Sequence, residues 1–347
     1  GCGALEQLAD HVKELNAKNP LVVIDKNLSA VLGEKVNKIL SPAGIEFSIY
    51  DQVEPEPPIE LADEGAALAQ KNKNDLVIGI GGGSAMDTAK AIAVIAANHA
   101  KATDFLGLGK VPKPGLPKIM IPTTAGTGSE VTFTAVFIRR DLKKKEGMNS
   151  VYLYPELALL DPELTLSLPP APTAQTGLDA LCHAIESYTS IHSSPMSELV
   201  SLEAITLIAR HLRTCVHDGK NLAAREKMLL GSLYAGLGLA NAGVTAVHSL
   251  SYPLGGKYGI GHGLANTMML PAVMKFNLPA ALEKFTDIAE AMGEETDGLP
   301  AREAAYLALD AVAALIEDCG IHATLADFGI TEKDFPELAD VALTVAR

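Results

Sequence analysis

The strongest constraint on the fold is a change of pattern near the middle of the chain. In the first half, short apolar runs alternate with helical stretches, and beyond a proline cluster at 169–172 only the 3.6-residue periodicity of helices remains. We expect buried strands at 21–25, 46–50, 76–80, 118–124 and 157–161, and segment 131–141 predicts an antiparallel pair. Alternation of strand and helix is typical of a mostly parallel sheet. We therefore predict an α/β domain over 1–166 and an all-helical domain over 167–347.

Length and charge limit the classes of partner. A chain of 347 residues is too long for one small core, so two domains are the default. Lys and Arg number 28 against 42 Asp and Glu, and the resulting net charge of −14 repels nucleic acid and anionic lipid. No uninterrupted run of about 18 apolar residues appears, which argues against a membrane span. We expect neither nucleic acid nor a membrane as partner.

The cysteines and the chain ends bear on the compartment. The four cysteines form neither a CxxC pair nor a dense framework, so they are read as reduced thiols of a cytoplasmic protein: Cys2, Cys182, Cys215 and Cys319. The chain opens in a helical pattern and stops in another without a stop signal, so we expect further residues beyond both ends. No signal peptide is visible.

A glycine-rich turn in LVIGIGGGSAMDTAKAIA joins a strand pattern to a helix pattern. The glycines at 81–83 permit a tight bend and close approach of a ligand, and the helix N-terminus beyond them suits a pyrophosphate. Ser84 either caps the helix or donates to a phosphate. The segment is neither GxGxxG nor a Walker motif, so an ordinary dinucleotide-binding assignment would be forced. A tight turn without a ligand is the alternative.

Asp25 follows the first predicted strand. A carboxylate at the carboxyl end of a strand can bind both ribose hydroxyls of an adenosine and repel a 2′-phosphate, which favours NAD over NADP. Taken alone, an Asp at this position is more often a helix cap or a solvated turn residue.

The segment PTTAGTGSEVT (122–132) concentrates hydroxyls and glycines after a strand. Thr123, Thr124 and Thr127 offer short donors, and the neighbouring glycines allow a close backbone approach. We interpret these threonines as candidate cofactor-binding residues, with a ligand-free turn as the alternative.

One carboxylate and three imidazoles form the candidate metal site. Asp179 and His183 lie four residues apart in a predicted helix, which places both side chains on one face. Glu186 falls on the same face and is a candidate for contacting one of the metal ligands on the side away from the metal. His248 and His262 follow later in AVHSLSYPLGG and GHG, and we place His248 near the end of a helix that SYPLGG breaks. Such a set suits Zn²⁺ or Fe²⁺. Catalysis with four protein ligands requires a fifth position for substrate, which favours Fe²⁺.

Four ordered motifs resemble the iron-containing (group III) alcohol dehydrogenases. DPELTLSLPPAPTAQTGLDALCHAIE and GVTAVHSLSYPLGGKYGIGHG are similar to the two signatures of that family, and GGGSAMDTAK and PTTAGTGSEVT are similar to its nucleotide-binding segments. The resemblance runs over nearly the whole chain. It implies a Rossmann-like, dinucleotide-binding α/β domain followed by a helical metal domain, as in dehydroquinate synthase, and a homodimer.

The resemblance also assigns site residues by position. It implies metal ligation by Asp179, His183, His248 and His262. The cofactor would be NAD, with NADP as the alternative, and the metal Fe²⁺, with Zn²⁺ as the alternative. It implies cofactor contacts by Gly82, Gly83, Ser84, Asp87, Thr123, Thr124 and Lys145, the last facing the ribose.

The chain departs from the family pattern near the catalytic metal. Four residues after His248, where the family commonly has a second histidine, this chain has Tyr252. Its hydroxyl could relay a proton, or its ring could form a wall of the substrate pocket. We take Tyr252 and His262 as the candidate catalytic residues. Gly261 replaces the usual proline before the fourth ligand.

The expected reaction is reversible hydride transfer between a primary alcohol, diol or hydroxyacid and its aldehyde, with NAD(P) as partner. A hydroxyacid–oxoacid transhydrogenase that retains its NAD is the closest competitor. A dehydroquinate-synthase-like lyase is disfavoured, because no dense Arg/Lys cluster for a phosphorylated substrate accompanies the metal motifs. A nucleotide-binding scaffold without catalysis would have no need for four converging ligands.

Overall fold

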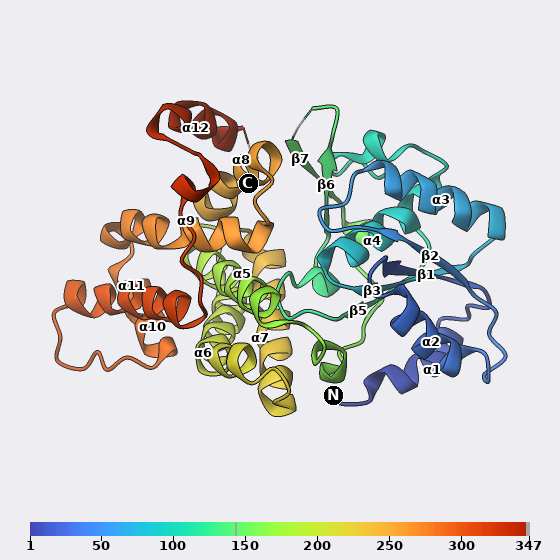
Figure 1. The fold of residues 1–347 in the computed structure, drawn as a ribbon, viewed down its shortest axis with the longest axis horizontal. Helices are drawn as coiled ribbons and strands as arrows, with labels where there is room; N and C mark the ends of the chain where they lie inside the picture. Colours follow the sequence, from blue (N-terminus) through green and yellow to red (C-terminus); the bar gives the residue numbers. More distant parts are fainter. Residues whose placement is uncertain (143, 345–347) are drawn as a thin grey trace. The chain divides into compact units, whose positions relative to one another are not determined.

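The computed structural model describes residues 1–142 and 144–344 (Figure 1). These residues form two compact units. The first contains Gly1–Thr124 and Ser129–Thr165, and the second contains Ala125–Gly128 and the chain from Leu166 onward. The second unit therefore takes four residues from the middle of the first, which no pattern in the sequence indicates.

The α/β unit is built on a five-stranded parallel sheet in the order β2-β1-β3-β5-β8. Its strands are β1 (Pro20–Asp25), β2 (Ser48–Val53), β3 (Leu76–Gly81), β5 (Lys118–Pro122) and β8 (Leu157–Ala158). This confirms the predicted parallel sheet. The strand order reverses between β1 and β3, and in doubly wound sheets ligands bind at the carboxyl ends of the strands at such a reversal.

Two predicted strands differ in extent. The edge strand β2 begins two residues later than the apolar run 46–50 and continues to Val53, because pairing with β1 and not apolarity sets its limits. Only every third residue of β2 is buried, so the prediction of a fully buried strand was wrong there. At the opposite edge, β8 pairs over only two residues before the chain enters a 3₁₀ turn at Pro162–Thr165.

Helices cover both faces of the sheet because successive strand residues point to opposite sides. Val22 and Ile24 share a core with α1 (Leu8–Glu14) and α2 (Ser29–Leu40). Leu21 and Val23 lie in a second core with α3 (Glu60–Asn72) and α4 (Gly83–Asn98). Helix α4 is buried over most of its length, which explains why half of its residues are alanine or isoleucine.

A second, three-stranded sheet has the order β4-β7-β6, with β4 at Gly107–Leu108, β6 at Thr134–Arg139 and β7 at Lys144–Asn149. Strands β6 and β7 are antiparallel, with Ala135 opposite Met148 and Phe137 opposite Glu146. The antiparallel pair expected from segment 131–141 is thereby confirmed. Its second strand, β7, is too polar to have been predicted from the sequence.

A buried ammonium group ties α4 to the segment that follows β5. Lys90 is fully buried, and its Nζ lies 3.2 Å from Asp87 Oδ1 and donates to the carbonyl oxygens of Ser129 (3.0 Å) and Thr134. Burial lowers the pKa of Lys90, whereas the Asp87 carboxylate raises it. A buried charge is tolerated only when it is paired and hydrogen-bonded in this way.

Glu130 belongs to the same buried region. Desolvation raises the pKa of Glu130 to about 7, against the opposing effects of a backbone hydrogen bond and the charge of Lys90. Its Oε1 has no hydrogen-bond partner among the described residues. The region therefore holds a carboxyl group whose charge changes near neutral pH.

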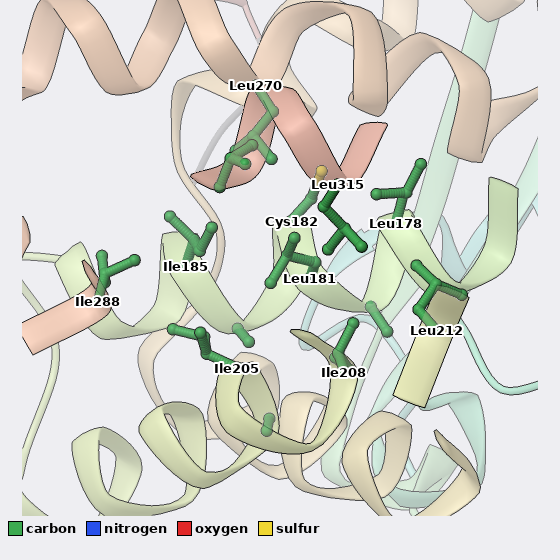
Figure 2. Close-up of a cluster of buried hydrophobic side chains, with 14 of the residues drawn as sticks. Leu178, Leu181, Cys182, Ile185, Ile205, Ile208, Leu212, Leu270, Ile288 and Leu315 are labelled. Atoms are coloured by element: carbon green, nitrogen blue, oxygen red, sulfur yellow. The ribbon is translucent and has the colours of Figure 1, made fainter. Parts of the chain in front are cut away.

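The second unit consists of helices, as predicted. They are α5 (Pro170–Thr189), α6 (Pro195–His217), α7 (Leu222–Ala242), α8 (Ala246–Tyr258), α9 (His262–Asn277), α10 (Leu282–Met292), α11 (Ala301–Asp318) and α12 (Phe335–Leu343). The proline cluster is the start of α5, where the missing N–H groups cost nothing. Figure 2 shows the aliphatic core around α5, in which Leu181 and Ile185 contact the neighbouring helices.

One predicted helix is two helices. The apolar periodicity of 222–250 predicts a continuous helix, but α7 ends at Gly243, whose φ of 73° is unfavourable for other residues, and α8 begins after a bend of 102°. Helix α8 continues through SYPLGG, with Pro253 inside it. His248 therefore lies in the first turn of α8, and the prediction that it lies near the end of a helix that SYPLGG breaks was wrong.

Among the described residues, no single helix has the length and apolar content needed to cross a membrane. Helices α7 and α8 meet these two criteria only when they are taken together across their bend.

Replacing Lys90 with Met should lower the free energy of unfolding by about 3–5 kcal/mol, because the substitution leaves the partly buried Asp87 carboxylate and the carbonyl oxygens of Ser129 and Thr134 without their cation. Lys38→Met is the matched control, since Lys38 forms an exposed pair with Glu34 (2.7 Å). Chemical denaturation of both variants checks this. Equal midpoints for the two variants would show that the buried ammonium does not stabilise the fold.

Candidate functional site

The four predicted metal ligands converge in the helical unit. Asp179, His183, His248 and His262 each present a donor atom, and these atoms lie within 4.8 Å of one another. Asp179 Oδ1 is 3.9 Å from Nε2 of both His248 and His262. The rings of His183 and His248 are stacked, with centroids 4.7 Å apart. No other cluster of His, Cys, Asp or Glu with this property occurs among the described residues.

Three helices bring these side chains together. Asp179 and His183 come from the middle of α5, as the i, i+4 spacing predicts, whereas His262 is the first residue of α9. The start of α9 lies against α5 so closely that a Cβ on Gly263 would be 2.4 Å from the Gln175 carbonyl oxygen. Glycine at 263 is therefore required for this approach. Gly261 has open space around it and a φ of −55°.

Glu186 binds His248 from behind, as expected from its place on the face of α5. Its Oε2 contacts His248 Nδ1, and its Oε1 accepts hydrogen bonds from the backbone N–H groups of Thr245 (2.7 Å) and Val247 (2.9 Å). A carboxylate only accepts, so Nδ1 of His248 carries the proton and Nε2 presents its lone pair to the other ligands. The same carboxylate caps the N-terminus of α8.

Charge at the cluster follows from burial and from the imidazoles. Burial alone would raise the pKa of Asp179, but electrostatic interaction with the rings of His183, His262 and His248 and a hydrogen bond from Asn266 hold it below its usual value. Asp179 is therefore an ionised, buried acceptor. Burial, together with Asp179 and Glu186, raises the pKa of Cys182 well above its usual value, so this thiol is not a reactive ligand.

Sequence reasoning missed Asn266. Its Nδ2 lies 2.6 Å from Asp179 Oδ1, 3.0 Å from His248 Nε2 and 3.2 Å from His262 Nε2. The residue is fully buried. The signal that could have found it is the one used for Asp179 and His183: Asn266 is four residues after His262 on one helix.

The donor set fits a divalent transition metal. Ligand atoms that share Zn²⁺ or Fe²⁺ lie about 3–4 Å apart, because each bond is about 2.0–2.2 Å long. The 3.9 Å separations match this range. In addition, Nδ1 of His183 is buried and has no hydrogen-bond partner among the described residues. A buried imidazole nitrogen without a partner is costly unless it has another ligand.

Tyr252 lies beside this cluster. It is one turn beyond His248 on α8, and its ring centroid is 6.2 Å from that of His262. The side chain is partly exposed. Tyr252, which stands where the second signature commonly has a histidine, therefore lies next to the candidate ligand His262.

The glycine turn lies at the carboxyl end of β3. Gly81 has a φ of 153°, and a Cβ there would be 2.7 Å from that of Ala85. Gly82 is the N-cap of α4 and provides no side-chain cap. Ser84 lies inside the first turn of α4, so the expectation that it caps the helix was wrong. Its hydroxyl remains a candidate donor to a phosphate.

Thr123 and Thr124 lie against this turn. The backbone N–H of Thr123 donates to the Gly81 carbonyl oxygen (2.9 Å). Thr124 Oγ1 is buried and has no hydrogen-bond partner among the described residues, and it would be 3.6 Å from a Cβ on Gly82. An unsatisfied hydroxyl beside a glycine at a helix N-terminus fits the phosphate of a dinucleotide.

Asp25 lies next to the glycine turn because β1 and β3 are paired. Ile24 is opposite Ile80, and a Cβ on Gly81 would be 4.0 Å from the Asp25 backbone N. One carboxylate oxygen of Asp25 accepts from the N–H of Asn27 (2.8 Å). Asp25 therefore has a role in its own turn as well as a position at the strand reversal.

Two further candidates are engaged with protein groups. The Asp87 carboxylate accepts from the hydroxyl of Ser129 (2.6 Å) and the N–H of Val136 (2.8 Å) in addition to its pairing with the buried ammonium. Lys145 lies in β7, and its Nζ is 2.5 Å from Glu56 Oε2.

Thr127 lies in the four-residue segment that clusters with the helices. A Cβ on Gly126 would be 2.7 Å from Thr176 Cβ, and one on Gly128 would be 2.5 Å from Gly236 Cα. These glycines are therefore required for packing against α5 and α7. We expected them to allow the approach of a ligand.

Comparison with known proteins agrees over both units. Residues 1–162 match the family model described as iron-containing alcohol dehydrogenase, and residues 173–347 match the C-terminal model of the Fe-containing alcohol dehydrogenase family. The chain is 42% identical to long-chain-alcohol dehydrogenase 1 of Geobacillus thermodenitrificans, covering 100% of this chain and 88% of the relative.

Solved structures give the same result. A crystal structure of 1,3-propanediol oxidoreductase superposes with a TM-score of 0.97 at 39% identity, covering 100% of this chain and 91% of the other. Sulfoacetaldehyde reductase from Bifidobacterium kashiwanohense, solved in complex with NAD⁺, gives a TM-score of 0.88 at 31% identity, covering 99% and 89%. With this agreement in motifs, fold and sequence, the chain belongs to the iron-containing alcohol dehydrogenase family.

Proposed function

We propose that this protein catalyses reversible hydride transfer between a primary alcohol and NAD⁺, with a divalent cation bound by Asp179, His183, His248 and His262. Membership of the family makes the chain an oxidoreductase that interconverts alcohols and aldehydes with a metal and NAD. The observation that carries the residue assignment is the convergence of four donor atoms within 4.8 Å. Fe²⁺ is the preferred cation, with Zn²⁺ as its competitor for the same ligands.

When bound, the cation supplies Lewis acidity and NAD supplies the hydride acceptor. The protein's own contribution is orientation. Glu186 holds His248 so that Nε2 faces the other donors, and burial of Asp179 keeps water away from an ionised ligand. Tyr252, whose ring centroid lies 6.2 Å from that of His262, would exchange a proton with the substrate hydroxyl or form a wall of the substrate pocket.

For the cofactor, we propose that the N-terminus of α4 at Gly82, Gly83 and Ser84 binds the pyrophosphate, helped by the hydroxyl of Thr124. Support comes from the buried, unsatisfied Oγ1 of Thr124 beside the glycine turn. Asp25, next to this turn, would bind the adenosine ribose and disfavour a 2′-phosphate, so NAD is preferred over NADP.

The remaining cofactor candidates divide into two kinds. Lys145 can reach a ribose only if it exchanges its contact with Glu56, so we propose a ribose contact that competes with that ion pair. Asp87 is saturated by protein donors, and we propose that it positions the segment after β5. Thr123 and Thr127 would line the cofactor path.

A transhydrogenase with retained NAD remains the second candidate for the same site, because it requires the same ligands and the same cofactor contacts. The relatives named above act on long-chain alcohols, 1,3-propanediol and sulfoacetaldehyde by their names. We therefore propose an aldehyde or alcohol as substrate and a panel that varies chain length and polarity.

The reaction is tested by elemental content and turnover of the anaerobically purified protein. We expect one equivalent of Fe²⁺ or Zn²⁺ and oxidation of added NADH with at least one C2–C6 aldehyde or semialdehyde. His262→Ala should lose the metal and the turnover together. Reduction of a 2-oxo acid by a hydroxyacid without consumption of added NADH would instead identify the transhydrogenase. Full activity of His262→Ala after chelation would contradict catalysis at this site.

The two glycines beside His262 provide a matched pair. Gly263→Ala should weaken metal binding at least about tenfold, because the new methyl group would push the start of α9 away from the Gln175 carbonyl group. Gly261→Ala should bind metal as the wild type does, since nothing lies within 4 Å of its Cβ position. Competition with a chromophoric chelator measures both. Similar affinities for the two variants would show that the close approach of α9 does not position His262.

Replacement of Tyr252 with Phe separates its two interpretations. If the hydroxyl transfers the substrate proton, kcat should fall about 100-fold while metal content is unchanged, because general acid–base groups contribute on that order. Steady-state kinetics across pH 6–10 measure the effect. An unchanged kcat with an altered KM would identify Tyr252 as a wall of the substrate pocket.

A further inference from the structure

Asn266 is directed at the same atoms that would bind the metal. A carboxylate only accepts hydrogen bonds, so the Asn266 atom that lies 2.6 Å from Asp179 Oδ1 must be the donor, the amide nitrogen. The opposite orientation would place two oxygens at that distance. The amide nitrogen therefore also faces His248 at 3.0 Å and His262 at 3.2 Å.

The two histidine nitrogens receive these hydrogen bonds through lone pairs. Glu186 holds the proton of His248 on Nδ1, so Nε2 of this ring carries a lone pair and accepts from Asn266. His262 Nε2 faces the same donor and accepts in the same way. The amide has two hydrogens for three acceptors, so one hydrogen is shared.

An unprotonated imidazole nitrogen has a single lone pair in the plane of the ring, so it can accept a hydrogen bond or bind a cation, but not both. His248 Nε2 and His262 Nε2 cannot accept a hydrogen bond from Asn266 and bind a cation at the same time. Asp179 differs, because a carboxylate oxygen has lone pairs for both. Binding of a cation thus requires the loss of two hydrogen bonds from Asn266 and permits the third to remain.

We propose that Asn266 is a positioning residue that competes with the metal: its amide holds His248 and His262 with their lone pairs inward, and the cation must replace it. This inference rests on the metal site proposed above. It predicts opposite effects on two properties. The amide stabilises the protein without metal, because it donates to the buried Asp179 carboxylate and to two imidazole nitrogens, and it weakens the binding of the cation. An asparagine with a purely structural role would increase both the stability of the metal-free protein and its affinity for the cation.

The test compares the wild type with Asn266→Ala, using Zn²⁺ alone as probe and a competing chelator to measure affinity. We expect Zn²⁺ to bind about tenfold more tightly to Asn266→Ala, since two hydrogen bonds no longer have to be broken. After chelation this variant should melt at a lower temperature than the wild type, and added Zn²⁺ should remove most of the difference. Asn241→Ala is the control, because Asn241 is exposed on α7 and its amide donates to the Leu237 carbonyl oxygen of the same helix (2.8 Å).

Unchanged or weaker binding of Zn²⁺ by Asn266→Ala would overturn the competition. If Asn266→Ala does not fold, Asn266→Ser decides the question: one hydroxyl donor replaces two amide hydrogens, so an affinity at or below that of the wild type contradicts the proposal. A wild-type protein that binds no Zn²⁺ or Fe²⁺ would overturn the metal site itself, and this inference with it. That result can be distinguished from failure of the competition alone, in which the wild type and Asn266→Ala would bind Zn²⁺ equally well.

Discussion

The arrangement of the helical unit around its metal ligands depends on one buried carboxylate. Glu186 receives backbone hydrogen bonds at the start of α8 and contacts His248 at the same time. The chain has just turned through 102°, and the N–H of Val247 in the first turn of α8 is buried and requires an acceptor. One side chain on α5 therefore closes a helix end and orients a ligand. Neither task could be changed without affecting the other.

The two proposed sites in this chain would bind their ligands by different physical means. The metal cluster would rely on side chains that are held by packing and by hydrogen bonds from neighbouring groups. The nucleotide site would rely on backbone: the paired ends of β1 and β3, a glycine turn, and the N-terminus of α4. A substitution in the metal cluster would remove a side chain that binds the cation. A substitution in the glycine turn would fill the space that the nucleotide needs.

Local patterns were sufficient for much of this molecule. The parallel sheet follows from apolar runs separated by helices, and Asp179 with His183 follows from the period of a helix. Tertiary contacts decided the rest. The break between α7 and α8 depends on one glycine with positive φ. The spacing from His262 places Asn266 on the same face of α9, but its contacts with Asp179 and His248 arise only where α5, α8 and α9 meet. Of the two alternatives for Ser84, capping of the helix is wrong, because Gly82, two residues earlier, takes the N-cap. Propensity does not distinguish such cases.

The membership of Ala125–Gly128 in the helical unit has a consequence for how this protein can be divided. The chain passes from one unit to the other three times: after Thr124, after Gly128 and after Thr165. A fragment beginning at Leu166 would lack the residues that fill the space beside Thr176 and Gly236. Exchange of one unit between related enzymes would therefore have to carry two separate pieces of gene, and a single crossover would leave one unit with a foreign insert.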